Sequence, residues 1–199
     1  MPRIHENLVA DRRRFLRMSV AGGLSLLAGG LLIPRLSAHD ATASPGSGDG
    51  EVLLQCFDDQ GRPLGPCRMH KLVLTDAQWH QRLSDAAFDV MRRDGTERAF
   101  SGAHERTGPG LYRCMGCDTA LYDAATQFDS GTGWPSFWQP IARSNVVESR
   151  DRSFGWTRTA ISCARCDSHL GHVFHDGPRP TGLRYCMNSV ALRFVPAAA

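Results

Sequence analysis

Two short stretches of this 199-residue chain carry the same pattern: Cys114-Met-Gly-Cys117-Asp-Thr-Ala-Leu121 and Cys163-Ala-Arg-Cys166-Asp-Ser-His-Leu170. They agree at four of eight positions, and Thr119 and Ser168 at a fifth position are chemically similar. Repetition of one short loop indicates two halves of a single site, each contributing one Cys-x-x-Cys turn.

A Cys-x-x-Cys turn presents two thiolates from one tight loop, and two such turns complete a tetrahedral metal site. Because four protein thiolates leave no coordination position open, the site is structural rather than catalytic. We expect one zinc ion held by Cys114, Cys117, Cys163 and Cys166. The 45 residues between the turns imply that the metal joins distant β-hairpins. Three alternatives stay open: iron bound by the same four thiolates, two redox-active Cys-x-x-Cys pairs, or two disulfides.

Seven cysteines is an odd number, which argues against a framework made only of structural disulfides. Beyond the paired turns the chain has Cys56, Cys67 and Cys186. Cys186 lies in a strand-like segment, with Arg184 two residues before it and Asn188 two after, so on a strand the three side chains share one face. A neighbouring cation lowers the pKa of a thiol, and the thiolate is the nucleophile. The alternative for Cys186 is a buried small hydrophobic residue.

Two histidines and one tryptophan add to this group. His169 and His172 follow the second Cys-x-x-Cys turn, where a rigid loop can hold an acid/base pair in place. Gly131-Thr-Gly-Trp-Pro-Ser-Phe137 presents the Trp134 indole on a turn constrained by glycine and proline. Such a ring suits the wall of a pocket. The alternatives are packed or surface histidines and a core tryptophan.

The rest of the sequence after the N-terminal region predicts two small helices that lead into a mainly β, antiparallel domain. One helix begins at Thr75 with a capping-box partner at Gln78, and a second begins at Ser84 and ends by Gly95. Short β-rich stretches separated by turn residues follow: Leu111–Cys114, Ala120–Tyr122, Asn145–Glu148, Gly155–Cys163, His172–Phe174 and Tyr185–Phe194.

The N-terminus is typical of a twin-arginine signal peptide over residues 1–43. Arg12-Arg13 precede an apolar run from Met18 to Ile33, and small-residue cleavage sites end at Ala38 and Ala43. We therefore expect export by the twin-arginine machinery to a periplasm-like space, with an uncleaved membrane anchor as the alternative. Residues 44–69 are expected to form a flexible linker and N-terminal arm, and residues 70–196 the folded domain.

Composition and charge exclude several classes of protein. With 42% hydrophobic and 22% charged residues the chain is neither a polytopic membrane protein nor wholly disordered. Residues 1–38 carry six arginines and two acidic residues, so the net charge of +3 belongs to the leader. The nearly neutral remainder offers no electrostatic attraction to nucleic acid. We expect a monomer without a nucleic-acid partner.

Taken together, the motifs resemble the B-type, R-epimer-specific methionine sulfoxide reductases. The resemblance covers about residues 70–195 and is carried by Cys114-x-x-Cys117, Ser130-Gly-Thr-Gly-Trp-Pro-Ser-Phe137, Cys163-x-x-Cys166, Gly171-His-Val-Phe174, Asp176-Gly-Pro and Pro180-Thr-Gly-Leu-Arg-Tyr-Cys186-x-Asn-Ser. It implies two small antiparallel sheets and a structural zinc remote from the active site. It also implies reduction of methionine-R-sulfoxide in proteins and peptides through a cysteine sulfenic acid.

The same resemblance implies a role for each matching residue. Cys186 is the nucleophile, Arg184 assists its thiolate, and the sulfoxide oxygen or its water is engaged by His169, His172 and Asn188. The substrate side is formed by Trp134, which packs on the terminal methyl, and Phe174. A thiol then resolves the sulfenic acid, and an outside dithiol such as a thioredoxin-like protein restores the enzyme.

One departure from the family concerns the resolving thiol. Many members have a cysteine at the position of Thr132. Cys56 and Cys67 are the candidates here, and we favour Cys67 because it lies closer to the motif-bearing domain. A disulfide between these two cysteines is the alternative, and it would leave Cys186 dependent on an outside thiol.

Two other functions stay open at this point. A non-catalytic zinc-ribbon binding module explains the four paired cysteines but gives no reason for Cys186, Arg184 and Asn188 together. A thiol-disulfide oxidoreductase that uses the Cys-x-x-Cys pairs predicts no bound metal. The sequence leaves open which reductant serves the enzyme and which oxidised proteins are its substrates.

Overall fold

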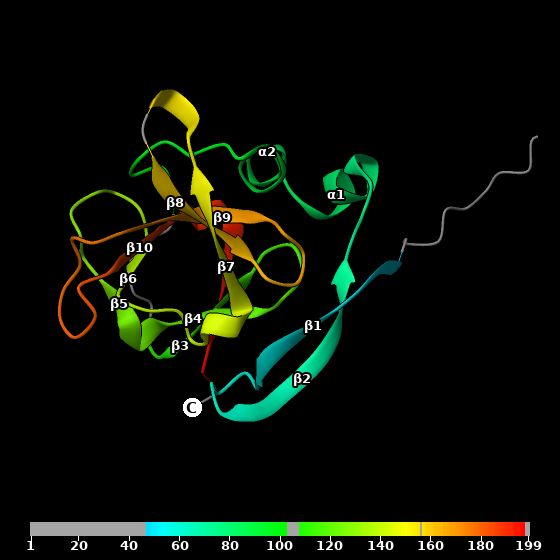
Figure 1. The fold of residues 1–199 in the computed structure, drawn as a ribbon. Coiled ribbons are helices and arrows are strands. Elements are labelled where there is room, and N and C mark those ends of the chain that lie inside the picture. The colour runs from blue at the N-terminus through cyan, green and yellow to red at the C-terminus, as the bar shows by residue number, and fades with distance from the viewer. Residues whose placement is uncertain (1–46, 103–107, 156, 198–199) are drawn as a thin grey trace, which may run out of the picture. The chain divides into compact units, whose positions relative to one another are not determined.

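The computed structural model describes residues 47–102, 108–155 and 157–197 (Figure 1). The signal peptide expected over residues 1–43 lies outside the described residues. Within them no helix has the length and apolarity to cross a membrane. The helices are α1 (Asp76–Arg82) and α2 (Asp85–Arg93), with short 3-10 turns η1 (Ala124–Thr126), η2 (Arg143–Asn145), η3 (Ser153–Gly155) and η4 (Ser189–Ala191).

The described strands form three antiparallel sheets. β1 (Ser47–Phe57) pairs with β2 (Pro63–Leu72) in a hairpin. The largest sheet has the order β5-β6-β10-β9-β8-β7, from Gln127–Phe128, Ser136–Phe137, Arg184–Met187, His169–Phe174, Arg158–Cys163 and Val146–Asp151. The third has the order β11-β3-β4, from Leu192–Pro196, Gly110–Cys114 and Ala120–Asp123. The mainly β, antiparallel prediction is confirmed, and the hairpin is a sheet beyond the two expected.

Both helices begin at capping residues. The Thr75 hydroxyl accepts a hydrogen bond from the Gln78 amide, and the Gln78 side chain accepts one from the Thr75 amide, so the capping box is complete. Ser84 caps α2 in the same way through the Ala87 amide. Trp79 of α1, and Phe88 and Met91 of α2, are buried, so both helices cover the core.

An aromatic cluster joins the six-stranded and three-stranded sheets. The ring of Tyr122 on β4 stacks on Phe137 of β6, with centroids 4.4 Å apart. Tyr112 of β3 meets the same Phe137 edge-on at 5.0 Å. Such pairs add about 0.5–1.5 kcal/mol to the area that the rings bury. The core therefore lies between the two sheets and is closed by α1 and α2.

The N-terminal arm differs from the flexible linker predicted over residues 44–69. Residues 47–72 form the β1–β2 hairpin, and the predicted domain boundary at residue 70 falls inside β2. The buried Asn145 side chain anchors the hairpin, because its oxygen accepts from the Gln55 amide and its nitrogen donates to the Gln55 carbonyl, both at 2.9 Å. At the other end the Leu72 amide donates to the Arg165 carbonyl.

A disulfide joins Cys56 of β1 to Cys67 of β2. This pairing is the alternative considered in the sequence analysis. Cys67 is thus not a free thiol in the structure, which corrects our preference for it as the resolving thiol. The physical reason is the hairpin itself, because antiparallel strands bring the two Cα atoms to 5.9 Å, a separation at which a bridge forms.

We expect the Cys56→Ser/Cys67→Ser double variant to open the hairpin while leaving the two larger sheets folded. The bridge spans 11 residues, for which the chain-entropy model gives a stabilisation of about 3 kcal/mol. Hydrogen exchange should accelerate at β1 and β2 amides and stay unchanged at β8 and β9. Unchanged exchange in the hairpin would mean that the Asn145 hydrogen bonds hold it without the disulfide.

Candidate active site and metal centre

The two Cys-x-x-Cys turns have the same local structure. In each, the residue after the second cysteine donates its amide to the carbonyl of the first cysteine at 2.9 Å, namely Asp118 to Cys114 and Asp167 to Cys163. Asp118 and Asp167 both adopt left-handed backbone angles, with φ of 65° and 54°. The repeated sequence therefore corresponds to a repeated loop at the ends of β3 and β8.

The four cysteines of these loops form one buried cluster, and their sulfur atoms all lie within 4.8 Å of one another. Two close contacts join the loops, with the Cys114 and Cys166 sulfurs 3.6 Å apart and the Cys117 and Cys163 sulfurs 3.4 Å apart. A tetrahedron with metal–sulfur bonds of about 2.3 Å has edges of about 3.8 Å. The donor set and its spacing thus fit one thiolate-bound metal ion.

Arginine side chains surround the cluster. Arg82 of α1 donates to the Gly116 carbonyl and Arg92 of α2 to the Cys166 carbonyl, both at 2.9 Å. Arg165 donates to the Cys117 carbonyl at 3.1 Å. These cations lie beside four sulfurs that must be deprotonated to bind a metal, and they favour that charged state.

The remaining cysteine, Cys186, lies on β10 in the middle of the six-stranded sheet. The register places it directly opposite His172 of β9 and Ser136 of β6. Directly opposed residues of antiparallel strands point to the same face, with Cβ atoms about 4.5–5.5 Å apart. The sheet therefore holds a thiol beside an imidazole.

Opposing influences act on the pKa of the Cys186 thiol. Burial raises the pKa of the Cys186 thiol, whereas Arg184 and hydrogen bonds from Thr132 and Ser136 lower it in part. Arg184 also donates two hydrogen bonds to Asp176, at 2.9 and 2.8 Å. Its cation is thus shared between a carboxylate and the thiol, and the net pKa shift of Cys186 is upward.

The two histidines have different partners. His172 Nε2 lies 2.8 Å from the Asp151 carboxylate, which Arg158 also contacts at 2.7 Å. The backbone amide of Ser153 is the first of several hydrogen bonds that hold the pKa of Asp151 well below its usual range, so Asp151 is an anion. His169 Nε2 is buried and has no hydrogen-bond partner within the described residues. Burial lowers the pKa of both imidazoles.

Asn188 lies directly after β10, between that strand and the 3-10 turn η4. β10 ends at Met187, and the expected long strand over 185–194 is broken by η4 before β11 joins the other sheet. The buried Asn188 side chain donates from Nδ2 to the Leu170 carbonyl and accepts at Oδ1 from the Glu97 amide. These two bonds hold the turn after Cys186, and they use one of the two N–H donors and one of the two oxygen lone pairs of the amide.

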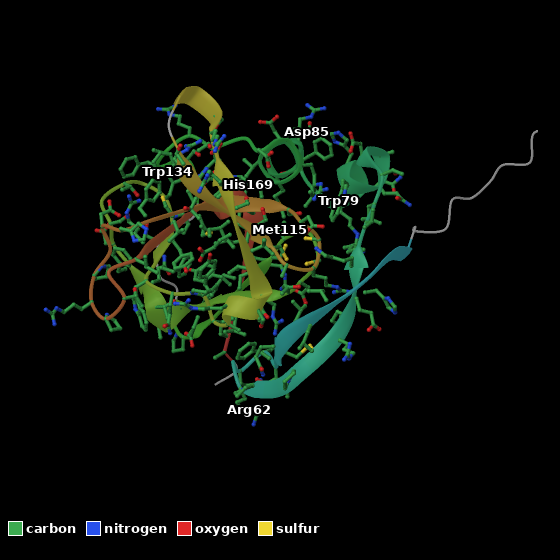
Figure 2. The ribbon with its side chains drawn as sticks, viewed as in Figure 1. Arg62, Trp79, Asp85, Met115, Trp134 and His169 are labelled. Carbon is green, nitrogen blue, oxygen red and sulfur yellow. A yellow bond between two sulfur atoms is a disulfide. The ribbon has the colours of Figure 1, made fainter. Side chains whose placement is uncertain are left out.

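Trp134 lies on the turn before β6, where Gly131 and Gly133 both have positive φ (69° and 83°). Figure 2 labels Trp134 and His169 among the side chains around the six-stranded sheet. The half-buried indole donates from Nε1 to the Glu97 carbonyl at 3.2 Å. On the same turn, Thr132 Oγ1 lies 3.9 Å from the Cys186 sulfur. The glycine-rich turn is therefore adjacent to the thiol, as expected for a ring that walls its pocket.

Phe174 contributes to the site indirectly. The Arg184 guanidinium lies 4.4 Å above the centre of the Phe174 ring, a cation–π contact that holds the arginine beside Cys186. The His172 and Phe174 rings have centroids 6.4 Å apart. Phe174 thus supports two of the predicted site residues.

Sequence reasoning missed Glu97, Asp151 and Ser136 as parts of this site. Ser136 belongs to the Ser130–Phe137 motif but was given no role there. The pairing of β6 with β10 places it opposite Cys186. Asp151 and Glu97 carry no local signal, because His172 lies 21 residues from Asp151, and Trp134 and Asn188 lie 37 and 91 residues from Glu97. Asp176 was quoted in a motif without a role, and the structure pairs it with Arg184.

Comparison with known proteins identifies one matching family model and several similar proteins. A family model described as the SelR domain matches residues 83–196. The chain is 54% identical over 129 residues to a peptide methionine sulfoxide reductase MsrB of Pseudomonas syringae pv. syringae (strain B728a), which covers 64% of this chain and 98% of that protein.

Two further relatives agree with this match. The MsrB of Pseudomonas fluorescens is 54% identical over 129 residues, covering 64% of this chain and 99% of that protein. The MsrB of Pseudomonas aeruginosa (strain UCBPP-PA14) is 53% identical over 119 residues, covering 59% of this chain and 90% of that protein. The chain therefore belongs to the SelR-domain family, the family of the MsrB peptide methionine sulfoxide reductases.

Proposed function

We propose that the chain reduces methionine-R-sulfoxide in peptides and proteins to methionine, with Cys186 as the nucleophile. The register that sets Cys186 opposite His172 carries the proposal, because it joins a thiol to an acid/base group on a rigid sheet. The names of the relatives support the substrate class.

The proposed reaction begins when the Cys186 sulfur attacks the sulfoxide sulfur. The sulfur–oxygen bond of the substrate breaks, and an imidazolium supplies the proton that the departing oxygen needs. The attack forms a bond between the two sulfur atoms, and the protonated oxygen leaves as hydroxide. The hydroxide then adds to the Cys186 sulfur, the sulfur–sulfur bond breaks, methionine leaves, and Cys186 is left as a sulfenic acid. The substrate sulfur gains two electrons and Cys186 loses two, so this half-reaction balances.

His172 is the better supported proton donor of the two histidines. Its Nε2 bond to Asp151 fixes the ring orientation and leaves Nδ1 for exchange with the substrate oxygen. His169, whose Nε2 has no protein partner among the described residues, is suited to hold the oxygen or a water. Trp134 is proposed to pack against the substrate methyl.

Regeneration is proposed to use an outside dithiol. With Cys56 and Cys67 paired, neither offers a free thiol to the sulfenic acid. One thiol of the reductant condenses with the sulfenic acid, releasing water, and its second thiol displaces Cys186 as the reductant becomes a disulfide. A thioredoxin-like protein has this chemistry.

The alternatives from the sequence fit this geometry less well. An oxidoreductase that uses its Cys-x-x-Cys pairs needs two separate redox pairs, whereas here the four sulfurs form one cluster with close contacts between the loops. A zinc-ribbon binding module leaves the arrangement of Cys186, His172 and Asp151 without a purpose.

We also propose that the four-cysteine cluster holds zinc rather than iron. A zinc ion would bind Cys114, Cys117, Cys163 and Cys166 and tie β3 to β8. Zinc has no redox chemistry of its own, which suits a site with four protein ligands and a structural role.

Residues 1–43 are proposed to direct export by the twin-arginine route to a periplasm-like space. The motif around Arg12 and Arg13 supports this proposal. The disulfide of the hairpin is compatible with such an oxidising compartment.

The reaction is tested by dithiothreitol-driven turnover of the two epimers of a peptidyl methionine sulfoxide. We expect the wild type to reduce the R epimer and leave the S epimer, and Cys186→Ser to lose more than about 1,000-fold in kcat, as expected for removal of a nucleophile. Cys186→Ser should keep its melting temperature. Full activity in this variant, or equal turnover of both epimers, would contradict the proposal.

The metal is tested by zinc analysis of single variants in each loop. We expect Cys114→Ser and Cys163→Ser to lose stoichiometric zinc and to unfold at lower temperature, because metal-binding energy is also folding energy. Cys186→Ser is the matched control that keeps both. Stoichiometric zinc in both loop variants would refute the four-thiolate assignment, and iron in the wild type would refute zinc.

Export is tested by locating the protein after replacing Arg12 and Arg13 together by lysine. We expect the double variant to stay in the cytoplasm while the wild type reaches the periplasm, because twin-arginine signals require both arginines. Lysine keeps the positive charge of arginine. If residues 1–43 acted only through their positive charge, the double variant and the wild type would therefore reach the same compartment. Normal export of the variant would rule out this route.

A further inference from the structure

Glu97 lies just after α2 and uses every polar group that it has. Its amide donates to Asn188 Oδ1 at 3.0 Å, and its carbonyl accepts from Trp134 Nε1 at 3.2 Å. Its carboxylate accepts from the Ser189 amide and hydroxyl at 2.6 and 2.8 Å and from the Val190 amide at 3.1 Å. One residue therefore joins the indole of Trp134 to the turn that follows Cys186.

The carboxylate has a defined task at that turn. η4 begins after Asn188, whose side chain makes no capping bond and whose Oδ1 accepts from the Glu97 amide instead. The free amides at the start of a helical turn need an acceptor, and an anion is the strongest one. Glu97 supplies this cap from a distant part of the chain.

The residues that follow Glu97 pack against the same two turns. The Phe100 amide donates to the Gly133 carbonyl at 2.8 Å, beside Trp134. A Cβ atom on Gly133 would lie 2.6 Å from the Phe100 ring, and one on Gly102 would lie 1.6 Å from Ser189 Oγ. Residues 97–102 thus occupy the space between the two turns without room for a further atom.

We propose that Glu97 is a positioning residue that fixes the Trp134 indole relative to Cys186 and so sets the fit of the substrate methyl group. The inference rests on the proposed function, in which Trp134 packs against that methyl. Glu97 touches neither the thiol nor the substrate, and it acts through the carboxylate that anchors its backbone to η4.

A spectroscopic measurement tests the position of the indole without activity. In protein labelled with 5-fluorotryptophan, Trp134→Phe assigns one of the four tryptophan resonances, and the buried Trp79 provides an internal reference. We expect Glu97→Ala to shift and broaden the Trp134 fluorine resonance and to leave that of Trp79 unchanged.

Kinetics test the consequence for the substrate. We expect Glu97→Ala to raise KM for a peptidyl methionine-R-sulfoxide about tenfold while kcat changes less than about threefold, because binding contacts are lost but the thiol and His172 stay in place. Glu97→Gln keeps an oxygen acceptor for the η4 amides and should restore most of the wild-type KM.

Asp123→Ala is the matched control, since the Asp123 carboxylate caps the 3-10 turn η1 through the Ala125 amide. It should lower stability without moving the Trp134 resonance or KM. If Glu97→Ala does not fold, Ser189→Ala removes the hydroxyl bond to the carboxylate and should give the same changes at smaller size.

An unmoved Trp134 resonance in a folded Glu97→Ala, or an equal shift in Asp123→Ala, would overturn the proposal. Altered kcat with unchanged KM would overturn it as well. Absence of turnover in the wild type would refute the proposed function instead, while the fluorine spectra would still report on Glu97.

Discussion

Four buried sulfur atoms from two loops lie within 4.8 Å of one another, and the two larger sheets, the two α-helices and the hairpin all meet at these loops. Cys114 ends β3 of the three-stranded sheet, and Cys163 ends β8 of the six-stranded sheet. Arginines from α1 and α2 donate to loop carbonyls, and the end of the hairpin donates to Arg165. Because four crowded thiolates repel one another without a cation, a bound metal would set the relative position of all these layers.

The candidate active site depends on the six-stranded sheet, which the four-cysteine cluster joins to the other layers. Cys186 and His172 meet only because β10 and β9 pair in one register, and a slip of one residue would turn one of them to the opposite face. The turns on either side are then tied to this sheet by polar side chains, Asp176 through Arg184 and Glu97 through Asn188. Strands thus position the reacting groups, and loops position what surrounds them.

The sequence predicted those parts of the fold that short-range patterns encode. Helix starts at Thr75 and Ser84 follow from capping chemistry within four residues, and the repeated Cys-x-x-Cys loop was visible as a repeat. The long strand expected through Asn188 was wrong, because the alternation of side chains does not reveal that η4 turns the chain into another sheet. Asp151 and Glu97 were missed because their partners are distant in sequence, and tertiary contacts decide such positions. The strands of the hairpin are neighbours in sequence, but the Asn145 side chain that anchors it lies 90 residues from Gln55.

The opposing pKa shifts in the site bear on the proposed chemistry. Burial raises the pKa of Cys186 and lowers those of His169 and His172, so both shifts favour the neutral forms, a thiol beside imidazoles. A thiolate–imidazolium pair has the same number of protons as a neutral thiol–imidazole pair. The proposed reaction uses one thiolate as nucleophile and one proton at the sulfoxide oxygen. In the proposed reaction, transfer of the thiol proton to His172 would supply both species at once. The ionised Asp151 favours that transfer because it stabilises the imidazolium, while Arg184, held by Asp176, stabilises the thiolate. The neutral resting state also keeps the thiol from reacting before a sulfoxide arrives, since only the thiolate is strongly nucleophilic.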